Sequence, residues 1–200
     1  MTLASDLAAN RHKVILDLCG GTGAWSRPYA EAGYDVRVVT LPELDVRTYQ
    51  PPDAVQGVLA APPCTHFTNS GAQYWRKKDA DGRTLLDTQI ISHCLRIIAT
   101  CAPNWFVLEN PVGRMRRWLG PPVLIFNPCD YGDPYTKRTC LWGRFGLPVQ
   151  RPVEPEFVLA SNGDRYSKIN MKTGGTSAKT KLLRSITPPG FARAFFEANP

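Results

Sequence analysis

A short apolar run that is followed at once by a glycine-rich turn constrains the fold of this chain most. Val14–Leu18 is short and apolar, which is typical of a buried strand, and residues 19–26 then lead into a predicted helix that continues through Glu31. Further strands are predicted at Asp35–Val39 and Gly57–Ala60. Strand, helix and strand in this order favour parallel βαβ winding and an α/β fold.

A long helix is predicted in the middle of the chain. Thr84 and Asp87 have the spacing of a helix cap at its start, and Pro103 ends it. A buried strand over residues 105–108 follows after a short turn. The apolar face of the helix is expected to consist of Leu85, Leu86, Ile90, Ile91, Cys94, Leu95, Ile97 and Ile98.

The chain as a whole is expected to form one domain over residues 1–200. A chain of this length can bury a sizeable core without disulfide or metal staples. Residues 69–83 are polar, aromatic and basic, and we expect them to form a mobile loop. Residues 161–181 have the composition of a second polar loop. No repeat or separate linker divides the sequence.

Charge is unevenly distributed along the chain, whose net charge is +7. Residues 1–60 carry 5 basic and 7 acidic side chains, residues 61–125 carry 8 and 4, and residues 126–200 carry 11 and 6. The excess of positive charge therefore begins after the third predicted strand. This asymmetry suits a polyanion that approaches one side of the molecule, and a merely solvated basic surface would look the same.

Targeting and metal signals are weak in this sequence. No stretch approaches the roughly 20 apolar residues of a membrane span, and the first residues lack the regions of a signal peptide, so a cytoplasmic protein is expected. The six cysteines include no Cys-x-x-Cys pair. Cys64 with His66, and His93 with Cys94, lack the repeated spacing of a zinc site, so no metal is expected.

The glycine turn has the features of a cradle for a nucleotide-like ligand. Asp17, Gly20, Gly21 and Gly23 stand between a strand and a helix, where backbone N–H groups can approach negative groups of a ligand. The spacing differs from the dinucleotide form Gly-x-Gly-x-x-Gly, and a tight turn without a ligand is the alternative. Trp25 could stack on a ligand or belong to the core.

Two other strand ends carry chemistry. Pro62 and Pro63 fix the direction of the backbone before Cys64, whose thiolate would be a nucleophile. Glu109 and Asn110 end the strand predicted at 105–108, and a carboxyl group buried there would stay protonated to higher pH and could act as an acid. Ligands of parallel sheets collect at such ends. A core cysteine and a turn-capping glutamate are the alternatives.

These motifs, in this order, resemble the cytosine-C5 DNA methyltransferase family. Residues 17–26 resemble its cofactor motif Asp-Leu-Phe-x-Gly-x-Gly-Gly-Phe-Ser, and residues 63–68 resemble its nucleophile motif Pro-Cys-Gln-x-Phe-Ser. Residues 109–111 resemble Glu-Asn-Val, and residues 131–138 resemble Gly-x-Pro-Gln-x-Arg-x-Arg. The resemblance covers about two thirds of the chain, between Val14 and Gly143, and is greatest to the compact phage-type members.

The resemblance implies a fold and a reaction. The fold would be that of Rossmann-like class I S-adenosylmethionine-dependent methyltransferases, a mostly parallel sheet with flanking helices. Cys64 would add to C6 of a cytosine in DNA, Glu109 would hold or protonate N3, and Lys137 or Arg138 would contact the base or its phosphates. C5 would then take the methyl group from S-adenosylmethionine. A cytosine in a duplex would have to be flipped out, whereas one in a single strand would not.

The resemblance also implies which residues bind the cofactor. Glu43 is a doubtful substitute for the usual ribose-binding acid, and residues 184–192 replace the usual Gly-Asn motif. The expected cofactor contacts are Asp17, Leu18, Cys19, Gly20, Gly21, Thr22, Gly23, Trp25, Thr40, Asp45, Val46 and Pro62.

A target-recognition module does not fit into this sequence. Only 41 residues, 144–184, separate the fourth motif from the C-terminal segment. We therefore expect a weak or very short sequence preference, with affinity supplied by basic residues, because phosphate contacts position a protein while base contacts specify. The expected nucleic-acid contacts are Thr68, Arg76, Lys77, Lys78, Arg114, Arg116 and Arg117, with Lys172, Lys179 and Lys181 as further candidates.

Three other functions remain open from the sequence. The same chemistry could act on RNA, single strands or a free nucleotide, because the polymer is not determined by the motifs. A non-catalytic nucleic-acid-binding protein could use the same fold, although binding alone does not require a placed thiol. A thiol hydrolase could use Cys64 with His66 or His93, but it would leave the glycine turn without a role.

Overall fold

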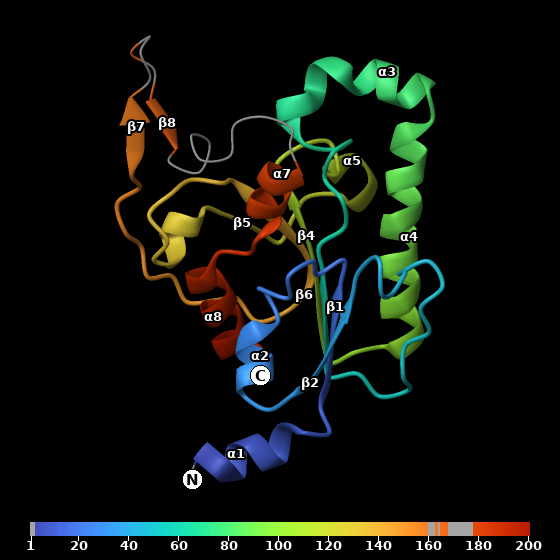
Figure 1. Cartoon of the computed structure of the whole chain (residues 1–200), viewed down its shortest axis with the longest axis vertical. Coiled ribbons are helices and arrows are strands. Elements are labelled where there is room, and N and C mark those ends of the chain that lie inside the picture. The colour runs from blue at the N-terminus through green and yellow to red at the C-terminus, as the bar shows by residue number, and fades with distance from the viewer. Residues whose placement is uncertain (1–2, 160–162, 164, 168–177) are drawn as a thin grey trace.

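A mostly parallel sheet organises the part of the chain that the computed structural model describes, which is residues 3–159, 163, 165–167 and 178–200. The sheet has six strands in the order β2-β1-β3-β4-β6-β5 (Figure 1). Among these six strands, β6 alone runs opposite to the other five, so the predicted parallel winding is confirmed. The strands are β1 (Val14–Leu18), β2 (Asp35–Val39), β3 (Gly57–Ala60), β4 (Trp105–Pro111), β5 (Leu124–Phe126) and β6 (Thr139–Arg144).

Helices cover both faces of this sheet. The long helix α4 lies along one face, while α2 and α8 lie against the other (Figure 1). A separate hairpin of β7 (Phe157–Leu159) and β8 (Arg165–Ser167) lies apart from the sheet. The helices are α1 (Leu3–Asn10), α2 (Arg27–Glu31), η1 (Asn69–Tyr74), α3 (Trp75–Ala80), α4 (Arg83–Cys101), α5 (Arg116–Leu119), η2 (Pro128–Tyr131), α7 (Ala178–Ser185) and α8 (Pro189–Ala198).

Two apolar cores hold the layers together, one on each face of the sheet. On the α4 side, Ile97 and Cys94 pack against strand residues such as Val58. On the other side the core is aromatic, and Phe191 stacks on Phe126 with ring centroids 4.0 Å apart. Because apolar burial stabilises at about 25 cal/mol per Å², these two layers fix the sheet and with it the positions of the strand ends.

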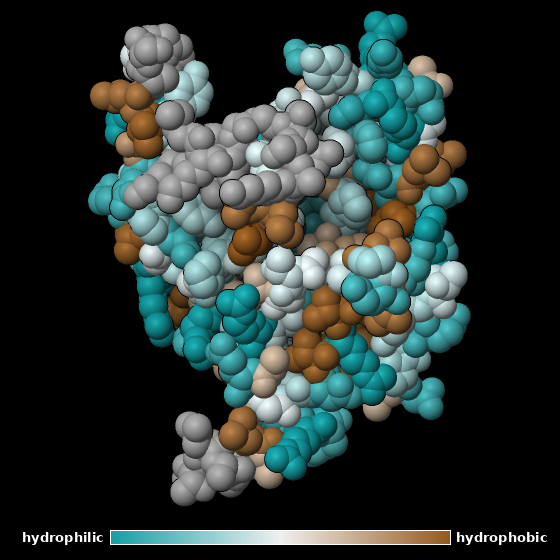
Figure 2. Space-filling model, in the orientation of Figure 1, coloured by the Kyte–Doolittle hydropathy of each residue, from teal (hydrophilic) through white to brown (hydrophobic). Residues whose placement is uncertain are grey.

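The predicted mobile loop over residues 69–83 is wrong. The structure has η1 and α3 there, and Figure 2 shows hydrophilic side chains gathered over α3. Local composition gave no helical signal, but tertiary contacts hold the segment: the Lys78 amine donates to the Thr65 carbonyl at 2.8 Å. The predicted cap at Thr84 is also wrong, because α4 begins at Arg83 and the buried Thr84 hydroxyl donates to Asp79 at 2.6 Å.

The predicted apolar face of α4 is correct only in part. Ile91, Cys94 and Ile97 are buried, whereas Leu85 and Leu86 are more than 60% exposed. Both leucines belong to the first turns of α4, which extend past the end of the sheet (Figure 1). Leu95 is exposed as well.

The second predicted loop also differs from the structure where it is described. Within residues 161–181, β8 and the first residues of α7 are regular structure. Residues 160–162, 164 and 168–177 lie outside the described part of the chain. Among the described residues, no helix has the length and apolar character that crossing a membrane would require.

Replacing Gly143 with alanine should strongly destabilise the fold. Gly143 has a φ of +140°, and a Cβ there would lie 2.2 Å from the backbone oxygen of Phe106 on β4. Backbone strain and overpacking together should lower the free energy of unfolding by about 3 kcal/mol or more. Gly82→Ala is the matched control, because its φ is +76° but its Cβ would meet open space. It should cost about 1–2 kcal/mol. Equal losses in urea unfolding of the two variants would contradict this reading of the sheet.

Candidate functional site

Three neighbouring strands bring Asp17, Cys64 and Glu109 to one edge of the sheet. In the parallel register Leu18 of β1 pairs with Ala60 of β3, which pairs with Leu108 of β4. Glu109 follows that row directly, and Cys64 follows it after the proline pair. The strand ends therefore converge as the sequence predicts for a parallel sheet.

A hydrogen bond joins the segment that leads into Cys64 to strand β4, which carries Glu109. The side-chain amide of Asn110 is fully buried, and its Nδ2 donates to the carbonyl oxygen of Pro62 at 3.0 Å. A buried amide that lost this partner would cost about 1–3 kcal/mol. The bond thus fixes the backbone just before Cys64 relative to Glu109, which precedes Asn110 in the chain.

The glycine turn encloses a buried carboxylate. Asp17 is completely buried and accepts a hydrogen bond from the Ser26 hydroxyl at 2.6 Å, while its Oδ1 has no partner among the described residues. Burial raises the pKa of Asp17 to about 6, because the charged form loses its hydration. A Cβ on Gly20 would lie 2.3 Å from the Asp17 carboxyl carbon, so only glycine fits there. Gly21 and Gly23 both have positive φ.

The side chains after Asp17 divide between core and surface. Leu18 and Trp25 belong to the two apolar cores, and Trp25 packs edge-on against Phe195 with centroids 5.5 Å apart. Their side chains are thus committed to packing, although Trp25 also borders the cavity described below. Cys19 has a φ of 59° and lies beside Cys94 of α4, and Thr22 is exposed.

The expected contacts beyond β2 are placed as follows. Asp45 accepts hydrogen bonds from Arg47 through both oxygens, and this guanidinium lowers the pKa of Asp45 to about 2. Val46 is buried in the core, and Thr40 is half-buried. The Asp45 carboxylate is therefore already paired, which differs from an acid held free for a ligand.

The Cys64 turn is closed on itself. The carbonyl oxygen of Cys64 accepts the N–H groups of Phe67 at 3.0 Å and Thr68 at 3.1 Å. Thr68 in turn forms an isolated bridge with Gly113, which follows β4. A Cβ on Gly113 would lie 1.9 Å from the Phe67 oxygen, so glycine permits this close approach.

Arg114 holds the Cys64 turn in place through hydrogen bonds. It is only 4% exposed, and its backbone N–H donates to the Phe67 carbonyl at 2.8 Å. Its Nε donates to the His66 carbonyl at 2.9 Å, one Nη donates to Asp79 at 2.8 Å, and the other donates to Thr84 at 2.7 Å. A single guanidinium thus connects the Cys64 turn (residues 64–68), which we also call the nucleophile turn, to α3 and α4.

Two of the residues expected to contact nucleic acid are buried and hydrogen-bonded inside the protein. Arg114 donates all these hydrogen bonds inside the protein, and Lys78 is only 9% exposed with its amine on the Thr65 carbonyl. Neither side chain is free to reach a phosphate. Arg76, Lys77, Arg116 and Arg117 are exposed, and Thr68 is half-buried. Lys172 and the side chains of Lys179 and Lys181 lie outside the described part of the structure.

The charges around Cys64 oppose one another. Burial and the neighbouring Glu109 raise the pKa of the Cys64 thiol, while Lys137 and Arg184 act to lower it. Burial likewise raises the pKa of Glu109, against the effect of Lys137. The Lys137 amine donates to the carbonyl of Arg184 at 2.8 Å. A protonated Glu109 beside Lys137 is therefore the state that favours the thiolate.

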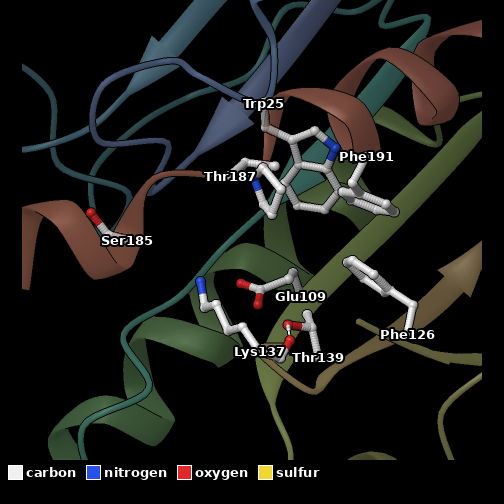
Figure 3. Close-up of a pocket in the computed structure, with 9 residues that line it drawn as sticks. Trp25, Glu109, Phe126, Lys137, Thr139, Ser185, Thr187 and Phe191 are labelled. Carbon is white, nitrogen blue, oxygen red and sulfur yellow. Dashed lines mark hydrogen bonds between the residues drawn. The ribbon is translucent and has the colours of Figure 1, made fainter. Parts of the chain in front are cut away.

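A small cavity of about 10 Å³ lies between Glu109 and the aromatic core (Figure 3). Such a space holds about one water molecule and no pyrimidine base. Ser185 at the end of α7 and Thr187 just before α8 border it, so the connection between these helices forms part of its wall. The full lining is Trp25, Glu109, Phe126, Lys137, Thr139, Ser185, Thr187, Pro188 and Phe191.

Sequence reasoning missed much of this lining. Ser185 and Thr187 lie in the stretch that replaces the family's Gly-Asn motif, and that departure was the only signal for them. Phe126 and Phe191 carry no motif, because their place in the site follows from packing across the sheet. Arg138, by contrast, is exposed, and its carbonyl accepts the Val112 N–H at 3.2 Å.

The described residues were also compared with the requirements of a metal site and of a cysteine–histidine pair. No group of three or more His, Cys, Asp or Glu side chains there could hold a metal ion. His66 is engaged through Nδ1 with Asp87 at 2.5 Å. All six cysteines are free thiols, and Cys64 and Cys19 are the two that are not buried.

Opposite changes at Glu109 and Lys137 should move the reactivity of Cys64 in opposite directions. Glu109→Gln removes a carboxylate whose charge raises the thiol pKa, so alkylation of Cys64 by iodoacetamide near pH 8 should become about three- to tenfold faster. Lys137→Met removes a cation, so alkylation should slow by a similar factor. Peptide mapping by mass spectrometry reports Cys64 alone, and changes of the same sign would contradict this electrostatic account.

Loss of the Arg114 guanidinium should loosen the nucleophile turn. Arg114→Met leaves the His66 carbonyl and Thr84 without a donor and should lower the free energy of unfolding by about 2–3 kcal/mol. Limited proteolysis should cut residues 64–82 faster. Arg116→Met is the matched control, because Arg116 is exposed two residues away, and it should change stability by less than about 0.5 kcal/mol. Equal effects of both variants would show that the network does not hold the turn.

Comparison with known proteins gives the fold a context. No protein-family model matches the chain, and no curated protein matches it. Among solved structures, it is similar to a protein described as a candidate DNA modification methyltransferase encoded within a prophage, from E. coli. The TM-score is 0.50 and the identity 18%, over 72% of this chain and 52% of that one. The chain thus spans about half the length of that protein.

A second solved structure is a DhpI–SAM–HEP complex, with a TM-score of 0.30 and 16% identity over 74% of this chain and 67% of that one. The strand order, the single antiparallel strand β6 and the likeness to the prophage protein together establish the architecture. The chain has the Rossmann-like fold of class I methyltransferases, with a mostly parallel central sheet and flanking helices.

Proposed function

We propose that this protein transfers a methyl group from S-adenosylmethionine to C5 of cytosine in DNA through a covalent bond between Cys64 and C6. The observation that carries the proposal is the junction of the Cys64 turn and Glu109 across the Asn110–Pro62 hydrogen bond. A thiol and a carboxyl group are held on adjacent strand ends of a methyltransferase fold. The likeness to a protein described as a DNA modification methyltransferase supports nucleic acid as the substrate.

Each residue has one task in this reaction. Cys64 forms the bond to C6 while Glu109, which its burial keeps protonated to higher pH, donates to N3 of the ring. Electron density then moves to C5, which takes the methyl group. Loss of the C5 proton to a base and cleavage of the C6–S bond then release the Cys64 thiolate, and N3 returns its proton to Glu109. Lys137 supplies positive charge beside both groups, which favours the thiolate.

The glycine turn suits the cofactor. Asp17 has a buried oxygen without a partner among the described residues, and the turn is open at Gly21, where a Cβ would meet no atom within 4 Å. When bound, S-adenosylmethionine would supply an activated methyl group. Asp17 and the backbone N–H groups of the turn would hold it, and their place beside β3 puts it next to the Cys64 turn.

The fit is less complete beyond β2. Asp45 is paired with Arg47, so an adenine contact there would require this ion pair to open. The side chains of Leu18 and Val46 contribute to the hydrophobic wall beneath the turn. The cavity at Glu109, about 10 Å³ in volume, has a further consequence: a base can enter only if part of its lining, which includes Ser185 and Thr187, moves.

Methyl transfer should depend on Cys64. We expect label from S-adenosylmethionine to appear in cytosine of DNA, and Cys64→Ala should reduce the rate by at least ~10³-fold because the nucleophile is lost. Cys101→Ala is the matched control, a buried thiol at the end of α4. Incorporation into cytosine that survives loss of Cys64 would sink the mechanism.

A trapped adduct tests the covalent step separately. DNA that carries 5-fluorocytosine has no C5 proton to lose, so the bond between Cys64 and C6 should persist. Mass spectrometry should then show one adduct on the peptide of Cys64, in wild type and in Cys101→Ala but not in Cys64→Ala. Methyl transfer without any adduct would require a different mechanism.

A further inference from the structure

An exposed aromatic and basic surface lies beside the nucleophile turn. Tyr74 at the end of η1 is 55% exposed, and Trp118 on α5 is 48% exposed. The exposed cations Arg76 and Lys77 lie on α3, which follows Tyr74 directly, and the exposed Arg117 precedes Trp118 on α5. We refer to Tyr74, Trp118, Arg76, Lys77 and Arg117 as the stacking surface.

This surface is connected to the backbone of Cys64 through Phe67 and Thr68. The ring of Trp118 packs edge-on against Phe67, with centroids 5.4 Å apart. The Phe67 N–H donates to the Cys64 carbonyl at 3.0 Å. On the other side, η1 follows Thr68, whose N–H donates to the same carbonyl, and ends at Tyr74. Both exposed rings are thus connected to the same end of the Cys64 turn, Trp118 through Phe67 and Tyr74 through the segment that follows Thr68.

The acids near the stacking surface offset its positive charge only in part, because their ion pairs are with other cations, although Arg117 also acts on Asp79 and Lys77 on Asp81. Asp79 is paired with the buried Arg114, and Asp81 is paired with Arg83. Arg117 lies over the ring of Trp75 at 5.9 Å, which orients its guanidinium beside the aromatic residues. A negatively charged partner is therefore favoured over a positively charged or a purely apolar one.

Exposed rings among cations distinguish between nucleic-acid forms. A paired duplex hides the faces of its bases and offers phosphates and groove edges, for which aromatic rings are of little use. An unpaired strand offers base faces, and stacking on an aromatic side chain contributes about 1–3 kcal/mol per base. A protein that binds a duplex through phosphates needs the cations of this surface but not Tyr74 and Trp118.

We propose that the stacking surface binds unpaired nucleotides next to the target cytosine, so that the substrate is a single strand of nucleic acid. The bases stack on Trp118 and Tyr74, and Arg76, Lys77 and Arg117 contact the phosphates. The assignment of a target base at Cys64 rests on the proposed function, but the binding of the strand does not require catalysis. An unpaired target also needs no flipping out of a duplex.

Binding is tested with the full chain carrying Cys64→Ala, so that no reaction occurs. Fluorescence anisotropy compares a labelled single-stranded DNA of mixed sequence, its duplex and the same sequence in RNA at one salt concentration. We expect either single strand to bind at least about tenfold more tightly than the duplex, and the DNA and RNA arms then identify the sugar. Trp118→Ala should weaken single-strand binding by about five- to 100-fold and leave duplex binding nearly unchanged.

Three further variants separate stacking from folding. Trp118→Phe should retain most of the affinity, because a ring remains. Tyr74→Ala should weaken single-strand binding by at least about fivefold, and Tyr74 is too exposed for its loss to unfold the protein. Leu147→Ala, at a residue 62% exposed on the far segment after β6, is the control and should change nothing.

Two results would overturn the proposal. One is duplex binding as tight as that of either single strand, and the other is wild-type affinity for single strands in both Trp118→Ala and Tyr74→Ala. Failure of the proposed function is visible separately. If single strands bind through Trp118 but the wild-type protein transfers no methyl group to cytosine in single strands or in the duplex, the strand-binding inference stands and the methyl-transfer proposal falls.

Discussion

The parallel pairing of β1, β3 and β4 is the constraint on which the rest of the site depends. It puts three chain segments far apart in sequence at one edge, in a register in which Leu18, Ala60 and Leu108 lie side by side. The bond from Asn110 to Pro62 then extends this order one step beyond the last strand pairing. A shift of one strand would move Glu109 away from Cys64 and leave a buried amide without its partner. The register and the site are therefore one structural property.

The sequence predicted this arrangement where short-range patterns carry it. The apolar runs, the glycine turn and the Pro-Pro-Cys segment are local signals, and parallel winding alone places their ends together. The patterns failed where long-range contacts decide. Nothing near Lys78 predicts that its amine bonds the Thr65 carbonyl, so α3 was not foreseen. Arg114 resembles a surface cation in sequence, and only the fold shows that four partners surround it.

Burial and charge work against each other at Cys64. The same enclosure that keeps Glu109 protonated to higher pH also keeps the thiol protonated, because both groups lose hydration. Lys137 and Arg184 both favour the thiolate, and the Lys137 amine also donates to the Arg184 carbonyl and so holds the end of α7 near the site. Closure of the cavity and activation of the thiol are thus linked through one side chain.

In the proposed reaction, this link would give the substrate a part in forming the site. A base beside Glu109 needs more room than the cavity of about 10 Å³ gives, so part of its lining, which includes Ser185 and Thr187, would have to move. If the end of α7 moved, the hydrogen bond from the Lys137 amine to the Arg184 carbonyl would break, and the positive charge of Lys137 would still favour a thiolate at Cys64. Meanwhile Arg114 keeps the nucleophile turn fixed to α3 and α4, so the turn need not reorganise when the opposite wall moves. In this proposal, the wall that Arg114 anchors carries Cys64 and stays fixed, whereas the wall of Ser185 and Thr187 would move to admit the base, and the buried guanidinium that holds the first wall accounts for the difference.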